Sequence, residues 1–208
     1  MDLDVYRQWM LSVGVSTRET ITDILDWPTT YMPWVWIAIF GINFTLTQMF
    51  LFDGREWAPL SEIFSKSLIL GPCIGIGFWL LFCSLITLIG WMFQRKVSWS
   101  RTFTASAWAT VPYNVKGIVL IPQILLFGDE LFARSTPELN QSATLTLLYL
   151  FFLLVDLLCI IWFYIVLVKS ISVAHQVAVW KASMVMVLSL CMVWIISLEI
   201  FNTLFFPL

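Results

Sequence analysis

Three ionisable side chains stand inside long apolar stretches of the chain. Lys116 lies in VPYNVKGIVL, Asp156 in LLVDLLCII and Glu199 in IISLEIF. A buried charge must be neutralised, paired or reached by water, so Asp156 and Lys116 are the obvious candidates for a pair. Such a pair either relays protons or ions or fixes the register of two helices. Because a relay usually needs more groups in series, we favour the structural role. The alternative partner of Asp156 is Asn114 or a neighbouring subunit, and Glu199 lies nearer its segment's external end.

Other polar or small residues fit structural roles. His175 is the only histidine and lies in KSISVAHQVAVWKA. Without a second histidine, we expect a solvated or interfacial side chain rather than a metal ligand or an axial cofactor ligand. Gly71 and Gly75 have GxxxG spacing, which lets helix backbones approach closely, and we expect them to pack within the chain. Asn43 and Gln48 are expected to hydrogen-bond to neighbouring helices.

Common catalytic motifs are absent from the chain. We find no GxSxG, HExxH or P-loop, and the apolar GPCIGIG run cannot cradle phosphate. The four cysteines form no CxxC pair and are typical of small buried hydrophobes. No enzyme activity, metal or cofactor is predicted; a pigment or a quinone held at an assembly interface is the cofactor type that the sequence leaves open.

The composition explains why these polar residues stand out. Of 208 residues, 60% are hydrophobic and 12% are charged, whereas an ordinary globular chain is about 25% charged. So few charges cannot cover a water-exposed surface, so most of the surface must face lipid. The net charge of −2 offers no basic field for nucleic acid, and no nucleic-acid partner is expected.

Five segments have the length and apolarity of transmembrane helices, which need about 20 residues. They cover residues 32–52, 68–93, 105–127, 143–168 and 182–208. The third contains Pro112, Asn114, Lys116 and Pro122, so we expect a broken helix, irregular from Pro112 to Lys116 and shielded by its neighbours.

Tryptophans and basic residues indicate the boundaries and the orientation of these spans. Trp34, Trp36, Trp91 and Trp180 lie near span ends, as expected at membrane interfaces. The deeper ones, Trp79, Trp162 and Trp194, are expected to pack between helices. Seven Lys or Arg residues flank the spans on one side and three on the other: Arg7, Arg18, Arg95, Lys96, Arg101, Lys169 and Lys181 against Arg55, Lys66 and Arg134. This bias predicts a cytoplasmic N-terminus and an external C-terminus, and we favour a bacterial inner membrane.

Residues 1–31 precede the first span. They lack the basic start of a cleaved signal peptide. Ser16 and Glu19 have capping-box spacing, apolar residues follow at helical spacing, and Pro28 ends the run. We expect a short amphipathic helix on the cytoplasmic membrane face, followed by a transmembrane domain over residues 32–208.

Three stretches resemble the Yip family of five-span membrane proteins, especially its short prokaryotic branch: LDWPTTYMPWVWI, FTASAWATVPYNVKGIV and IIWFYIVLVKSISVAHQVAVWKA. The resemblance covers roughly residues 25–195 and implies five helices with a cytoplasmic N-terminus. Eukaryotic members look like trafficking factors that bind prenylated Rab-type GTPases. This chain lacks their long N-terminal region and DLYGP signature, so GTPase binding is not expected.

The sequence therefore predicts an all-α polytopic membrane helix bundle of about five spans with a short interfacial N-terminal helix. We expect a non-enzymatic scaffold or accessory subunit that contacts the lipid bilayer and other membrane subunits. Two alternatives stay open. One is a small ion or solute transporter that uses Asp156, Lys116 and Glu199. The other is a Yip-like trafficking or membrane-organising factor.

Overall fold

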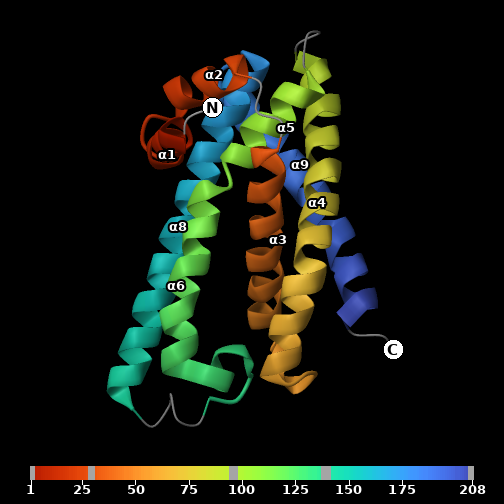
Figure 1. The fold of residues 1–208 in the computed structure, drawn as a ribbon. Helices are drawn as coiled ribbons and strands as arrows, with labels where there is room; N and C mark the ends of the chain where they lie inside the picture. The colour runs from red at the N-terminus through yellow and green to blue at the C-terminus, as the bar shows by residue number, and fades with distance from the viewer. Residues whose placement is uncertain (1–2, 28–30, 94–97, 137–141, 206–208) are drawn as a thin grey trace.

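The computed structural model is a bundle of long helices with shorter helices gathered at one end (Figure 1). It describes residues 3–27, 31–93, 98–136 and 142–205, but not the side chains of residues 3, 93, 194 and 196–205. No strand occurs within these ranges, which confirms the all-α prediction. The α-helices are α1 (Leu3–Ser12), α2 (Thr17–Asp26), α3 (Met32–Leu51), α4 (Leu60–Phe93), α5 (Trp99–Trp108), α6 (Val111–Phe127), α8 (Ala143–His175) and α9 (Val179–Phe205).

Three of the described helices are long and apolar enough to cross a membrane: α3, α4 and α8. The 33 residues of α8 extend about 50 Å at 1.5 Å per residue, well beyond a hydrocarbon core of about 30 Å. Helices α6 and α9 run along the same bundle (Figure 1). A membrane helix bundle is thus confirmed, while the passage of α6 and α9 through the bilayer stays a prediction.

The predicted third span is two helices, α5 and α6, separated at Ala109 and Thr110. We expected the irregularity between Pro112 and Lys116, but these residues form regular helix at the start of α6. Pro112 lies in the first turn, where a missing N–H breaks no helical hydrogen bond. The proline therefore begins a helix rather than disrupting one, and the break precedes it.

The N-terminal segment forms two helices instead of the single helix that we expected. Ser16 precedes α2 as predicted, but its side chain makes no capping hydrogen bond. The capping box is therefore wrong; Thr20 Oγ1 instead donates to the Ser16 carbonyl and lies 2.9 Å from Ser12 Oγ. Apolar residues of both helices, including Trp9 and Ile21, are buried in the main hydrophobic core. We call α1 and α2 the cap.

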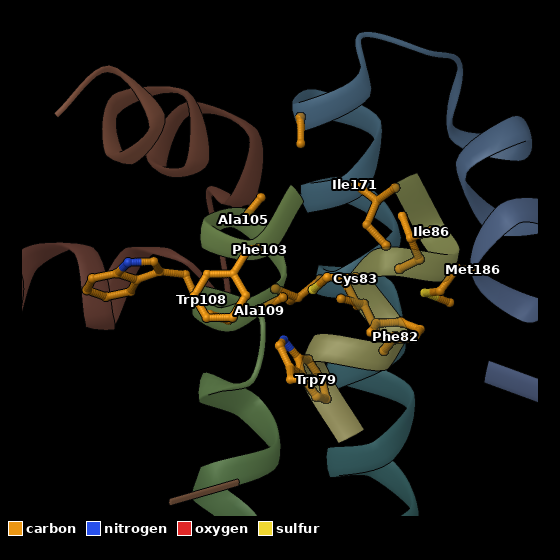
Figure 2. Packing of buried hydrophobic residues seen from close by; sticks show 14 of the residues in the cluster. Trp79, Phe82, Cys83, Ile86, Phe103, Ala105, Trp108, Ala109, Ile171 and Met186 are labelled. Carbon is orange, nitrogen blue, oxygen red and sulfur yellow. The ribbon is translucent and has the colours of Figure 1, made fainter. Parts of the chain in front are cut away.

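The main core lies beneath the cap, where α3, α4, α5, α6, α8 and α9 meet. Figure 2 shows Trp79, Phe82, Cys83 and Ile86 of α4 in this cluster, with α5, Ile171 of α8 and Met186 of α9. Trp79 Nε1 donates to Ser106 Oγ over 3.2 Å. The expected burial of Trp79 is confirmed. The expected burial of all four cysteines is wrong, because Cys73 and Cys191 are exposed on the bundle surface.

Helix α8 changes character along its length. Large apolar side chains are exposed from Leu147 to Ile165, whereas the following turns up to His175 are mostly buried. Trp162 lies near this change, where its indole donates to the Gly14 carbonyl over 3.0 Å. We expected Trp162 to pack between helices, but it is 36% exposed. A partly exposed indole that donates a hydrogen bond is typical of a membrane interface. Trp194 falls among the undescribed side chains.

Helices α3 and α4 approach closely at three glycines, which confirms the expected packing of the GxxxG residues within the chain. A Cβ added to Gly75 would lie 2.5 Å from Gly41 Cα and 2.7 Å from the Ile37 carbonyl oxygen. A Cβ on Gly41 would meet the Gly71 carbonyl oxygen. These atoms belong to the backbone and cannot move aside without separating the two helices.

We predict that Gly75→Ala destabilises the protein, because its methyl group would push α3 and α4 apart. Overpacking of this kind costs about 1–3 kcal/mol. Gly77→Ala is the matched control, since a Cβ there meets nothing within 4 Å and alanine favours helix. Thermal unfolding in detergent should give a lower Tm for Gly75→Ala and an unchanged or higher Tm for Gly77→Ala. Equal Tm values for the two variants would contradict the glycine contact.

Candidate functional site

A buried cation connects α3 and α6 in the middle of the bundle. Lys116 is 7% exposed, and its Nζ donates to Thr47 Oγ1 over 2.8 Å. Tyr113 OH donates to the same hydroxyl at 3.3 Å, and that hydroxyl donates to the Asn43 carbonyl at 2.8 Å. A threonine hydroxyl has one donor and two acceptor positions. All three are used here, so Thr47 fixes Lys116 and Tyr113 against α3.

Two asparagines form the adjoining part of the site. Asn43 Nδ2 lies 3.4 Å from Asn114 Oδ1, and Asn114 Nδ2 donates to the Trp36 carbonyl at 3.2 Å. This confirms that Asn43 bonds to a neighbouring helix. Gly117 makes the approach possible, because a Cβ on that residue would overlap the Asn43 side-chain amide. Residues 113–117 of α6 therefore contact α3 mainly through polar groups over about one helical turn.

Asp156 comes to this site from α8. It is half-buried, and its Oδ1 is buried without a hydrogen-bond partner among the described residues. The charge of Lys116 is close enough to act on it, and the side-chain amide of Gln123 on α6 lies close enough to the carboxylate to act as a hydrogen-bond donor. The predicted proximity of Lys116 and Asp156 is therefore confirmed.

The prediction of a direct ion pair between Lys116 and Asp156 is wrong. Among the described residues, Arg55–Asp129 and Lys66–Glu62 form ion pairs within 4.0 Å, but no such pair joins Lys116 to Asp156. Lys116 instead donates to Thr47, because its side chain reaches α3 rather than α8. Asn114, the alternative partner, bonds to α3 as well. Neither predicted partner therefore satisfies the Asp156 carboxylate.

Gln123 is the second unsatisfied group. It is 4% exposed, and among the described residues its Nε2 has no hydrogen-bond partner. A buried polar group without a partner costs about 1–3 kcal/mol. The Gln123 amide and the Asp156 carboxylate thus lie side by side on α6 and α8, close enough to interact although not in ideal hydrogen-bond geometry.

This polar layer separates two hydrophobic clusters. Phe163 and Tyr113 belong to the main core beneath the cap. Phe127 and Phe152 belong to a smaller cluster toward the opposite end, and their rings lie edge to face at 6.0 Å. Asp156 lies between Phe152 and Phe163 along α8. The site is therefore bounded by apolar packing above and below.

The remaining predicted residues lie outside this site. His175 is 2% exposed, and its Nε2 lies 2.9 Å from Thr102 Oγ1 of α5. The expectation of a solvated or interfacial histidine is wrong, because α8 continues to His175 beneath α5. Gly71 and Gly75 belong to the α3–α4 contact, and Pro112 begins α6. Glu199 lies in α9, but its side chain is outside the described set.

Sequence reasoning missed Thr47, Tyr113 and Gln123 as parts of the site. One signal was available for Gln123: it follows Lys116 by seven residues, which places both on one face of a helix. No pattern distinguished Thr47 from the other threonines, because its role depends on how α3 faces α6.

We predict that Asp156 and Lys116 are coupled through space although they make no direct contact. Asp156→Asn should destabilise the protein in part by leaving the Lys116 charge uncompensated, and adding Lys116→Met should recover part of that loss. The coupling energy should be about 0.5–3 kcal/mol. Thermal unfolding in detergent of the single and double variants measures it. The control combines Asp156→Asn with Lys181→Met, at the capped end of α9, and should be additive. Additivity of the Lys116 pair as well would exclude the coupling.

Comparison with known proteins identifies the family of this chain. The Yip1 domain model matches residues 12–201, a range that includes α2 through most of α9 and every residue of the polar site. No curated protein and no solved structure matches the chain. Since the match covers nearly the whole sequence, the resemblance seen in the three sequence stretches is confirmed, and the chain belongs to the Yip1 domain family.

Proposed function

We propose that this integral membrane protein is a non-enzymatic scaffold or accessory subunit that presents its cap to a partner at the cytoplasmic membrane surface. The observation that carries this proposal is the attachment of the cap. Trp9, Val13, Ile21 and Ile24 are buried in the same core as the long helices. The cap is therefore held in a fixed position on the bundle, as a docking platform must be.

The outer surface of the cap is suited to a polar partner. Its exposed charged residues are Asp4, Arg7, Arg18, Glu19, Asp23 and Asp26. Among them, acidic side chains outnumber basic ones, which favours a partner with a basic patch. Charge complementarity of this kind contributes chiefly to specificity and to the rate of association.

Basic residues support a cytoplasmic location for this end. Arg7, Arg18 and Arg101 lie in α1, α2 and α5, Lys169 near the end of α8 and Lys181 near the start of α9, whereas Arg55 follows α3, Lys66 lies near the start of α4 and Arg134 follows α6. The elements of the first group meet at the capped end of the bundle (Figure 1). Short membrane-flanking segments rich in Lys and Arg stay in the cytoplasm. The proposed location is a bacterial inner membrane with the cap inside.

This orientation predicts the labelling of single cysteines introduced into a cysteine-free variant. Val15 of the cap and Glu56 of the opposite end are both exposed, so cysteine at either position should be reactive wherever reagent can reach. A membrane-impermeant maleimide added to intact cells should label Glu56→Cys and leave Val15→Cys unlabelled until the cells are opened. The reverse pattern would refute the orientation.

We predict that reversing charge on the cap removes a bound partner without unfolding the protein. Glu19→Lys with Asp23→Lys changes two exposed residues one helical turn apart on α2, and such surface changes usually alter stability by less than about 0.5 kcal/mol each. The full chain is extracted in native-lipid nanodiscs, and its assemblies are weighed by native mass spectrometry. The heavier assembly of the unaltered chain should be lost in this variant.

Glu56→Lys is the matched control, since it reverses an exposed charge at the opposite end. The assembly should survive this change. An unaltered chain that is found alone, or a partner that stays bound to the cap variant, would contradict the proposal.

A further inference from the structure

Two aromatic side chains are exposed at the edge of the cap. Trp27 directly follows α2 and is 53% exposed, and Tyr31 directly precedes α3 and is 59% exposed. The ring centroids of Trp27 and the buried Trp9 lie 6.5 Å apart, in an edge-to-face contact. The ring centroids of Tyr31 and Tyr6 are also 6.5 Å apart. Each exposed ring therefore rests against a ring of α1.

Trp108 of α5 holds the two inner rings in place. It is buried and reaches from α5 toward the cap (Figure 2). Its ring centroid lies 5.9 Å from that of Trp9, edge to face, and 6.4 Å from that of Tyr6, on which it stacks. Two continuous series of ring contacts thus connect the core to Trp27 and to Tyr31. Because these exposed rings are already ordered, a partner that binds them loses little free energy to their immobilisation, and such residues often dominate the energy of an interface.

Carboxylates lead along α2 to the ring of Trp27. Glu19 and Asp23 are exposed and lie eight and four residues before it, so the three residues share one face of the helix. Asp26 is exposed directly beside Trp27. The basic residue of α2, Arg18, precedes Trp27 by nine residues, which places it on the opposite side of the helix. The surroundings of the Trp27 indole are therefore negative.

An exposed indole among carboxylates is suited to a guanidinium group. A guanidinium stacks on the face of an indole and at the same time donates hydrogen bonds to carboxylates at its edge. The chain itself shows an indole that attracts a cation, because Lys181 Nζ lies 5.6 Å from the centroid of the Trp180 ring. Among the described residues no Lys or Arg lies over Trp27 in this way, so a cation for this ring has to come from another molecule. An anionic lipid headgroup would be repelled by the same carboxylates.

We propose that Trp27 is the centre of the docking surface of the cap and that it binds an arginine side chain of the partner. The guanidinium stacks on the indole and pairs with the carboxylates of Asp23 and Asp26, while Tyr31 extends the aromatic surface. This inference rests on the proposed docking role of the cap, and it names the residue and the chemistry through which that role is carried out.

The test measures how a fluorescent tetra-arginine peptide binds to the full chain in phosphatidylcholine nanodiscs, by fluorescence anisotropy at low salt. A tetra-citrulline peptide of the same shape but without charge should bind much more weakly. Trp27→Ala should weaken binding of the arginine peptide about two- to fivefold, the factor expected for one exposed cation–π contact. Trp180→Ala is the matched control, because it removes a tryptophan that is 60% exposed and already carries Lys181 over its ring. It should leave the affinity unchanged.

Two further variants keep the test independent of the folding of Trp27→Ala. Trp27→Phe keeps an aromatic ring next to Trp9 and should restore at least half of the lost affinity. Asp23→Asn with Asp26→Asn leaves the rings in place and should weaken binding of the arginine peptide by a similar factor. Equal affinity of the unaltered chain for the two peptides would overturn the proposal, as would unchanged affinity for the arginine peptide in Trp27→Ala.

Insertion of Trp27 into the bilayer would give a different result. In protein labelled with 5-fluorotryptophan, the fluorine signal of Trp27 is assigned from its loss in Trp27→Phe. This signal should shift with the arginine peptide, and a water-soluble gadolinium chelate should broaden it more than spin-labelled phosphatidylcholine does. Stronger broadening by the lipid would place the ring in the bilayer and would refute its role in docking.

The native assembly separates this inference from the docking role on which it rests. The heavier assembly seen by native mass spectrometry should be lost in Trp27→Ala and kept in Trp180→Ala. An assembly that is lost in Glu19→Lys with Asp23→Lys but kept in Trp27→Ala would overturn this inference alone, since the partner would then dock elsewhere on the cap. An unaltered chain that is found alone would overturn the docking role itself, and this inference with it.

Discussion

The hydrogen bond from Lys116 to Thr47 is the constraint around which the bundle is arranged. A lysine at mid-membrane costs about 2.5–3.5 kcal/mol on insertion scales if it faces lipid. If α6 crosses the bilayer as predicted, Lys116 has to face the interior, and its bond to Thr47 fixes the rotation of α6 against α3. In that rotation Gly117 meets Asn43, and Asn114 reaches the backbone of α3 at Trp36. The break before Val111 then lets α5 turn across the end of the bundle, where it covers the main core (Figure 1).

Helix α3 occupies the centre because its two sides carry different chemistry. Gly41 and Asn43 are two residues apart, so they point to nearly opposite sides of the helix. The glycine side admits α4 at backbone distance, and the amide side admits α6 through hydrogen bonds. Neither contact relies on the hydrophobic effect, which is weak between helices in lipid. Close packing and polar contacts thus replace it at the point where the bundle is surrounded by hydrocarbon.

Much of the fold could be predicted because apolar length and prolines are local properties. The starts of α3 and α8 and the end of α6 are those predicted, whereas the break in the third span falls two or three residues before Pro112 rather than after it. The polar site was harder to predict, because its contacts depend on how each helix is rotated about its axis. Lys116 and Asp156 share a depth, but no local pattern shows that Lys116 reaches Thr47 first. His175 was misjudged for the same reason, because only the tertiary arrangement places α5 over the end of α8.

The polar layer also explains why the long helices hold one alignment. An apolar helix can slide along another by a turn at little cost, because one leucine replaces another. Here a slide would move Asp156 among the rings near Phe152 or Phe163 and would separate Lys116 from Thr47. Either change would leave a charge among apolar side chains, where it costs several kcal/mol. Polar groups between two apolar clusters therefore penalise every alignment except one.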